Sequence, residues 1–120
     1  MITEKKVSQM IIDIAGDLLT TPESQEEMQA HLNVVRTAWN IAIKPELARK
    51  KELKSFIKKQ AKYAPSTEAL EGLELEMKRM IQQKNTLYPS INGKVVSAEV
   101  IKKGQDDYVI RAYFSGNRET

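Results

Sequence analysis

The spacing of apolar residues changes once along this chain, at Tyr88-Pro89, and this change limits the fold more than any other feature. Before it, apolar residues recur at the three- and four-residue intervals of amphipathic helices. After it, residues 94–103 and 107–115 alternate with a period of two, which is typical of half-buried strands. We therefore predict an α+β fold in which four packed helices precede a C-terminal antiparallel β-hairpin.

The length of 120 residues predicts one domain, large enough to form a hydrophobic core. Apolar residues make up 41% of the chain and charged residues 29%, which are values close to globular averages, so we expect a folded chain. We assign residues 1–120 to a single domain, with a helical part over 1–88, a β-hairpin over 89–115 and a frayed tail over 116–120.

Start and stop signals place the helices. In chain order we expect them at 5–19, about 22–43, within the basic segment 44–62, and about 67–86. Thr21-Pro22-Glu23 supplies a hydroxyl cap and a proline at the start of the second helix, and Pro65-Ser66-Thr67 ends the third helix and caps the fourth. The second helix is apolar around most of its circumference, which predicts a central position anchored by Trp39. In the fourth helix, Lys84 interrupts an apolar heptad spacing.

Charge and apolarity select the same register for the hairpin. With Val100 opposite Ile110, the other facing residues are either oppositely charged or both apolar, and a shift by two residues spoils both kinds of match. The predicted pairs are Glu99 with Arg111, Lys103 with Asp107, and Ile101 with Val109.

The turn of the hairpin is expected at Gly104-Gln105-Asp106, where Asp106 would adopt the left-handed conformation that such loops usually give to glycine. We expect Val96, Ala98 and Val100 to share the face that packs on the core. Because a lone hairpin is marginal in water, the stretch before Asn92-Gly93 is a candidate third strand.

Positive charge is concentrated between Lys44 and Lys62, where eight basic residues stand against two acidic ones. This segment carries +6 in a chain of net charge +3, so the remainder sums to −3. On a helical wheel its lysines gather into one surface, which we call the lysine ridge. With its flanks, the lysine ridge comprises Lys44, Lys50, Lys51, Lys54, Lys58 and Lys62. Arg49 falls near the apolar side, and we expect it to have a structural partner.

Two interpretations of the lysine ridge stay open. Lysines four residues apart on a helix repel by about 0.2–0.5 kcal/mol per pair, which favours an anionic partner such as nucleic acid. The ridge has no arginine, whose planar guanidinium makes the paired hydrogen bonds that recognise guanine, and it has no aromatic residue for stacking. Sequence-specific recognition is therefore not expected. Alternatively, the ridge is solvated or is neutralised within the fold. The acids of the fourth helix that could neutralise it are Glu68, Glu71, Glu74 and Glu76.

His31 is the only histidine, and it lies at the edge of the apolar face of the second helix with Glu27 one turn before it. Such a pair can ligate a metal or act as acid and base. A complete metal site needs further ligands, for instance Glu71 or Glu74, and no second signature accompanies the pair. We therefore expect a boundary histidine with an ordinary hydrogen bond and predict no metal site.

The residue types argue against catalysis. The chain has no cysteine, which excludes disulfides, thiolate metal sites and a cysteine nucleophile. No phosphate-binding loop or nucleophile motif occurs, and a single histidine leaves little room for general-base chemistry. We predict a non-enzymatic protein with no catalytic residues and no cofactor.

The first twenty residues do not resemble a signal peptide, because charges interrupt their apolar run. No apolar stretch approaches the roughly 20 residues that span a bilayer. We therefore expect a cytoplasmic protein with no membrane partner.

Apolar residues outside the main stripes predict a second covered surface. A two-layer fold of this size would leave several of them exposed, and two-fold homodimers are the commonest way to cover such a patch. These residues are Ile12, Leu19, Val34, Ile41, Leu75, Val95, Ile101, Val109 and Tyr113. The sequence thus predicts a small cytosolic interaction or regulatory protein that acts through protein–protein contacts, with a protein partner or a second copy. The alternative is a nucleic-acid-binding protein that uses the lysine ridge.

Overall fold

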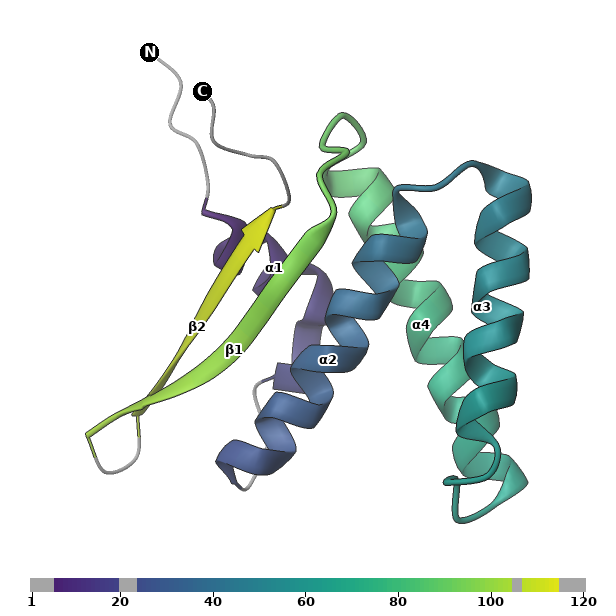
Figure 1. Ribbon diagram of the computed structural model, residues 1–120, viewed down its shortest axis with the longest axis horizontal. Helices are drawn as coiled ribbons and strands as arrows, with labels where there is room; N and C mark the ends of the chain where they lie inside the picture. The colour runs from purple at the N-terminus through teal and green to yellow at the C-terminus, as the bar shows by residue number, and fades with distance from the viewer. Residues whose placement is uncertain (1–5, 20–23, 105–106, 115–120) are drawn as a thin grey trace. The chain divides into compact units, whose positions relative to one another are not determined.

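The computed structural model describes residues 6–19, 24–104 and 107–114 (Figure 1). Its helices precede a two-stranded antiparallel sheet, so the predicted α+β class is confirmed. In chain order the elements are α1 (Val7–Ala15), the 3₁₀ helix η1 (Gly16–Leu19), α2 (Gln25–Ala42), α3 (Glu46–Gln60), α4 (Thr67–Leu87), β1 (Val95–Lys103) and β2 (Asp107–Phe114).

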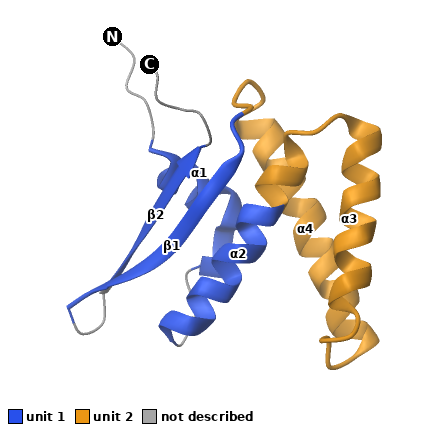
Figure 2. Ribbon diagram, viewed as in Figure 1, with its two compact units in different colours: residues 1–37, 93–120 blue, residues 38–92 orange. Residues whose placement is uncertain are grey.

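The chain divides into two compact units (Figure 2). Unit 1 consists of residues 1–37 and 93–120, and unit 2 consists of residues 38–92. Unit 1 therefore combines α1, most of α2 and the hairpin, whereas unit 2 combines the end of α2 with α3 and α4. The assignment of residues 1–120 to one domain stays a prediction.

The helix starts and ends follow local signals. The first helix is shorter than predicted, because Gly16 has a φ of 60° and the chain continues as η1. Thr21-Pro22-Glu23 lies outside the described residues. The described part of α2 begins at Gln25, and the Ser24 hydroxyl accepts a hydrogen bond from the Glu27 amide at 3.0 Å. Ser66 caps α4 as predicted, since its hydroxyl accepts from the Ala69 amide at 3.0 Å.

Buried residues of α2 contribute to both units. Leu32 and Val35 are fully buried and belong to unit 1, whereas Trp39 is fully buried and belongs to unit 2. The Trp39 ring lies 6.1 Å from the ring of Tyr88, in a tilted arrangement. The predicted anchoring role of Trp39 is therefore confirmed within unit 2.

The hairpin has the predicted register. The observed pairs include Val100 with Ile110, Glu99 with Arg111, Ile101 with Val109, and Lys103 with Asp107. Of the predicted turn, Gly104 is described and has a φ of 77°, so glycine takes a left-handed conformation at the first position. Gln105 and Asp106 lie outside the described residues, as does the predicted frayed tail.

An irregularity in β1 changes which face its first valines occupy. Val95 pairs with Phe114 and Ser97 pairs with Tyr113, so β1 holds an extra residue between them. Such a bulge alters the alternation of side chains. Val95 is fully buried and Val96 is 47% exposed, which is the reverse of the prediction for these two residues. Beyond the bulge, Val100 is buried as expected.

The candidate third strand is not present. The described residues between α4 and β1 contain no strand. The chain instead turns after Tyr88, and the Ile91 amide donates to the Tyr88 carbonyl at 3.2 Å. Pro89 has no amide hydrogen to offer a sheet. The sheet is therefore the two-stranded hairpin alone within the described ranges.

Candidate functional site

The lysine ridge lies in unit 2, on α3 and beside it. Lys44 precedes α3, Lys62 follows it, and the other four ridge lysines lie on the helix. Lys44 Nζ lies 3.0 Å from a Glu52 carboxylate oxygen, and Lys50 Nζ lies 4.0 Å from one of Glu46. The side chains of both pairs are exposed, and exposed pairs of this kind contribute only about 0–1 kcal/mol.

The centre of the ridge has no counter-charge among the described residues. The side chains of Lys51, Lys54 and Lys58 are exposed and form no ion pair or hydrogen bond with any described residue. Their charge is therefore available to an anion from solution, and their mutual repulsion is not relieved inside the described fold.

The acids of α4 pair within their own helix. Glu74 lies 3.4 Å from Lys78, and Glu76 is paired with Arg79 one turn later. No ion pair joins an acid of α4 to a ridge lysine within the described ranges. Of the two interpretations of the ridge, neutralisation by the fourth helix therefore has no ion pair to support it within the described ranges.

An aromatic residue does accompany the ridge, which corrects a further expectation. Tyr63 lies in the turn after α3 and is 73% exposed, and Lys62 Nζ lies 5.6 Å from the centroid of its ring. The helical wheel could not place Tyr63, because α3 ends at Gln60. An exposed ring beside lysines can stack on a nucleic-acid base.

Arg49 has the structural partner that the sequence predicts, since its Nη1 donates to the Lys44 carbonyl at 2.9 Å. Arg49 also lines a cleft of about 440 Å³ between α3 and α4, together with Lys50 and Lys78. Those two lysines are ion-paired within their own helices. Every cation among the described lining residues is therefore bonded within the fold, which makes the cleft a poor anion site.

His31 makes the ordinary hydrogen bond that was expected. Its Nδ1 lies 2.8 Å from the Leu18 carbonyl oxygen, and because a carbonyl can only accept, Nδ1 carries the proton. No group of three histidine or acidic side chains that could hold a metal is found among the described residues. His31 therefore joins α2 to η1 within unit 1.

Lys84 on α4 is a buried lysine at the position where the sequence interrupts the apolar heptad spacing. Only 1% of its surface is exposed, its Nζ lies 5.3 Å from the Trp39 ring centroid, and its hydrogen bond to Asn85 Oδ1 is long, at 3.5 Å. Burial, reinforced by the positive charge of Arg49, lowers the pKa of Lys84 below the usual lysine value. Lys84 thus occupies an apolar heptad position and is buried there.

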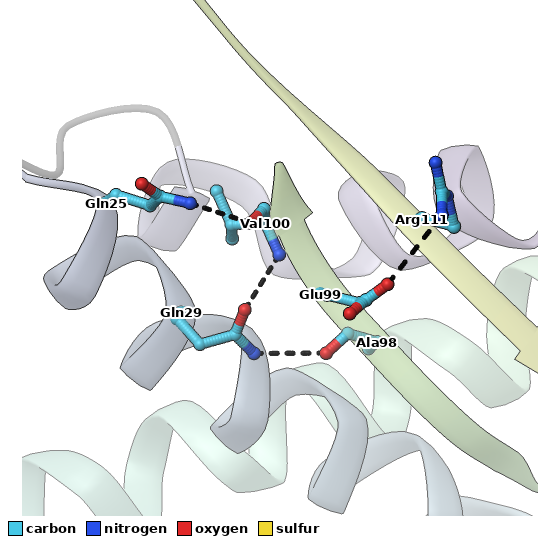
Figure 3. Close-up of polar contacts among 6 residues, drawn as sticks. All are labelled: Gln25, Gln29, Ala98, Glu99, Val100 and Arg111. Carbon is cyan, nitrogen blue, oxygen red and sulfur yellow. Dashed lines mark hydrogen bonds and ion pairs between the residues drawn. The ribbon is translucent and has the colours of Figure 1, made fainter. Parts of the chain in front are cut away.

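The side chains of α2 close one edge of the hairpin (Figure 3). Gln29 Nε2 donates to the Ala98 carbonyl at 3.0 Å, while Gln29 Oε1 accepts from the Val100 amide at 2.7 Å. Gln25 Nε2 donates to the Val100 carbonyl at 3.0 Å, and Arg36 Nη1 donates to the Val96 carbonyl at 3.0 Å. The carboxamide of Gln29 therefore bonds to β1 as the peptide group of a neighbouring strand would.

The outer edge of β2 receives no such side-chain hydrogen bonds from the described residues. Both main-chain groups of Val100 point to α2, so its partner Ile110 directs its own groups away from β1. By alternation, Tyr108 and Ala112 do the same. No hydrogen bond reaches these outward groups from any described residue. In Figure 1, α2 runs beside β1, and α1 lies behind β2 with its first turn drawn next to the end of that strand.

Two neighbouring hollows run along β2 and α1. One, of about 390 Å³, is lined by Lys6 to Ser8 and by Val109 to Tyr113. The other, of about 380 Å³, shares four lining residues with the first and adds apolar residues of α1, η1 and α2; the shared residues are Lys6, Ser8, Val109 and Ile110. We call these two hollows the edge groove. The apolar residues that it gains are Ile12, Leu19 and Met28.

Exposed apolar residues flank the same edge. Val109 is 40% exposed and Tyr113 is 53% exposed, as the sequence predicted for some of its surplus apolar residues. Leu19, Ile41 and Val95 are buried instead. The uncovered apolar surface of unit 1 therefore includes side chains of β2 itself.

Comparison with protein-family models, with curated proteins and with solved structures finds no match for this chain. Among the described residues, no helix is long and apolar enough to cross a membrane.

Proposed function

We propose that this chain is a small, cytosolic, non-enzymatic interaction protein that acts through protein–protein contacts, and that it makes them at the outer edge of β2. The contrast between the two edges of the hairpin carries this proposal. Side chains of α2 bond to the edge of β1, whereas the outward main-chain groups of Tyr108, Ile110 and Ala112 on β2 have no hydrogen-bond partner among the described residues. An extended segment of a partner gains main-chain hydrogen bonds at such an edge.

The chemistry of the residues supports a role without catalysis. The chain has no cysteine, and its only histidine binds the Leu18 carbonyl through Nδ1. Lys84, the described group with a lowered pKa, does not line the cleft between α3 and α4. A binding surface is therefore the better-supported use of this fold.

The test is a titration with a fluorescent peptide of alternating valine and threonine, residues that favour extended strands. We expect its anisotropy to rise on addition of the protein, and the rise to be lost with Ile110→Pro, which removes one outward amide hydrogen and no bond to β1. Ile110→Ala is the matched control, because it shortens the side chain and keeps the amide. Equal binding by both variants would contradict the proposal.

The lysine ridge supports a second candidate function, the binding of nucleic acid without sequence-specific recognition. Lys51, Lys54 and Lys58 lack counter-charges in the described fold, and Tyr63 adds an exposed ring at the end of the ridge. Binding that depends on phosphate contacts weakens steeply as salt rises.

Oligonucleotide titrations at about 50 mM salt test this candidate. Lys54→Glu combined with Lys58→Glu should abolish binding, whereas Lys94→Glu combined with Lys102→Glu, which changes the net charge equally in unit 1, should leave most of it. Flat titrations of the unmodified chain would remove this candidate.

A further inference from the structure

We propose that the partner at the outer edge of β2 is a second copy of this chain, paired antiparallel about a two-fold axis that passes beside Val109. The two hairpins would then form one continuous sheet. This inference rests on the proposed function, because it assigns an occupant to the edge through which that function acts.

Hydrogen bonding restricts how two β2 strands can meet. The residues that direct main-chain groups outward are Tyr108, Ile110 and Ala112, and in an antiparallel pair each must face another outward residue. Near the middle of the strand, three two-fold arrangements satisfy this condition. They place Val109, Ile110 or Arg111 opposite the same residue of the second copy.

Charge complementarity selects one of the three. The arrangement centred on Arg111 places two arginines opposite each other, which is repulsive. The arrangement centred on Ile110 places Arg111 opposite Val109 of the second copy. Only the arrangement centred on Val109 places Arg111 opposite Asp107 of the second copy, and it does so twice because of the symmetry.

The same arrangement satisfies the main chain and the apolar surface. Tyr108 faces Ile110 of the second copy, and the two residues exchange both of their outward main-chain hydrogen bonds. Val109, which is 40% exposed in one copy, meets Val109 of the other at the axis. The added strand also lies along the edge groove, whose apolar residues Ile12 and Leu19 can receive its side chains.

The decisive experiment uses two single charge reversals, Arg111→Asp and Asp107→Arg. The unmodified chain should give a mass about twice the 13.7 kDa of one copy by light scattering at high micromolar concentration. Each variant alone faces like charges across the axis, so its dimer dissociation constant should rise by about tenfold or more. An equal mixture of the two variants should recover dimers, because the aspartate introduced in one variant then faces the arginine introduced in the other.

Two controls separate loss of pairing from loss of folding. Arg111→Asp also removes the contact between Arg111 and Glu99, whose charged atoms lie 4.0 Å apart within the hairpin. Glu99→Arg breaks the same contact and should leave the dimer intact. Arg111→Asp combined with Glu99→Arg restores an opposite-charge pair in the hairpin and should still weaken the dimer.

The outcomes distinguish this inference from the proposed function. A mass of 13.7 kDa for the unmodified chain would overturn the pairing of two copies through this register. An unchanged dimer dissociation constant in both charge-reversal variants would overturn it as well. If the valine–threonine peptide nevertheless binds and Ile110→Pro abolishes that binding, the interaction function stands with another occupant. If the peptide also fails to bind, the proposed function fails as well.

Discussion

Each unit contains a group of polar side chains that the other lacks in this form among the described residues: side chains bonded to a strand edge in unit 1, and a buried lysine with a row of uncompensated ridge lysines in unit 2. In unit 1, the polar ends of Gln25, Gln29 and Arg36 meet main-chain groups of β1 that would otherwise lack partners. In unit 2, Lys84 is buried with one long hydrogen bond, and the central lysines of the ridge have no counter-charge in the described fold.

The difference indicates which polar residues stabilise the fold. A side chain that satisfies a main-chain group removes a desolvation cost, whereas an uncompensated charge adds one when buried and repels its neighbours when exposed. We therefore expect substitutions of the side chains that bond to β1 to destabilise the chain, and substitutions at Lys84 or the ridge to be stabilising or neutral.

The largest expected effect is at Gln29. Gln29→Leu leaves the Ala98 carbonyl and the Val100 amide without partners, and we expect a loss of about 2 kcal/mol in the free energy of unfolding. Urea denaturation followed by circular dichroism measures it. Gln9→Leu is the matched control within unit 1, since the Gln9 side chain bonds to the Asp13 side chain, at 3.1 Å, and to no main-chain group of the described residues. Equal effects of the two substitutions would contradict the stabilising role assigned to the bonds between Gln29 and β1.

The second effect has the opposite sign. Lys84→Met keeps a long side chain beside Trp39 and removes the buried charge, so we expect the chain to gain about 1–2 kcal/mol of stability at neutral pH. The midpoint of urea unfolding should rise. A lower midpoint would mean that the contact between Lys84 and Trp39 outweighs the cost of burial.

The buried charge of Lys84 should also make the free energy of unfolding depend on pH. Because the pKa of Lys84 is lowered in the folded chain, the unfolded chain binds more protons between that lowered pKa and the usual lysine value. The free energy of unfolding attributable to Lys84 should therefore rise with pH across this interval. Lys84→Met should remove that rise, and an unchanged pH profile in the variant would assign it to other groups.

A smaller loss is expected at Gln25. Gln25→Ala removes one hydrogen bond to the Val100 carbonyl, whereas Gln29 makes two bonds to β1, so we expect a loss of about 0.5–1 kcal/mol. Thermal unfolding of the two single variants and of their combination compares the stability losses at Gln25 and Gln29. A loss at Gln25 as large as at Gln29 would contradict the count of bonds.

The smallest effect is expected on the ridge. Lys54→Glu combined with Lys58→Glu breaks no ion pair of the described fold, so we expect a change in unfolding free energy within about 0.5 kcal/mol. Differential scanning calorimetry at low salt measures it. A large destabilisation would show that the ridge is neutralised within the protein after all.

Sequence reasoning succeeded where residues distinguish the alternatives. The hairpin register could be derived because Glu99 opposite Arg111 and Lys103 opposite Asp107 match in only one alignment. The bulge could not be derived, since Val95 and Val96 are the same residue type and either can face the core.

The candidate surfaces were harder to read from the sequence. Gln25 and Gln29 look like solvated residues of an amphipathic helix, and nothing in the local pattern links them to a strand far away in the chain. Lys84 is a charged residue at an apolar heptad position, so its charge predicts exposure whereas its spacing predicts burial. Tyr63 lies beyond the end of α3 and therefore outside any helical wheel.

The closure of β1 by α2 has a consequence for the order of events as the chain folds. The hydrogen bonds that close this edge join residues 60 to 75 positions apart, whereas the hairpin is a local structure. After dilution from denaturant, the hairpin should form first and expose both of its edges to other molecules for a time. On the ribosome, Gln25 and Gln29 are synthesised before β1, so they can bond to the edge of β1 as soon as that strand forms. Refolding yields should therefore fall with protein concentration more steeply than yields of newly synthesised chain.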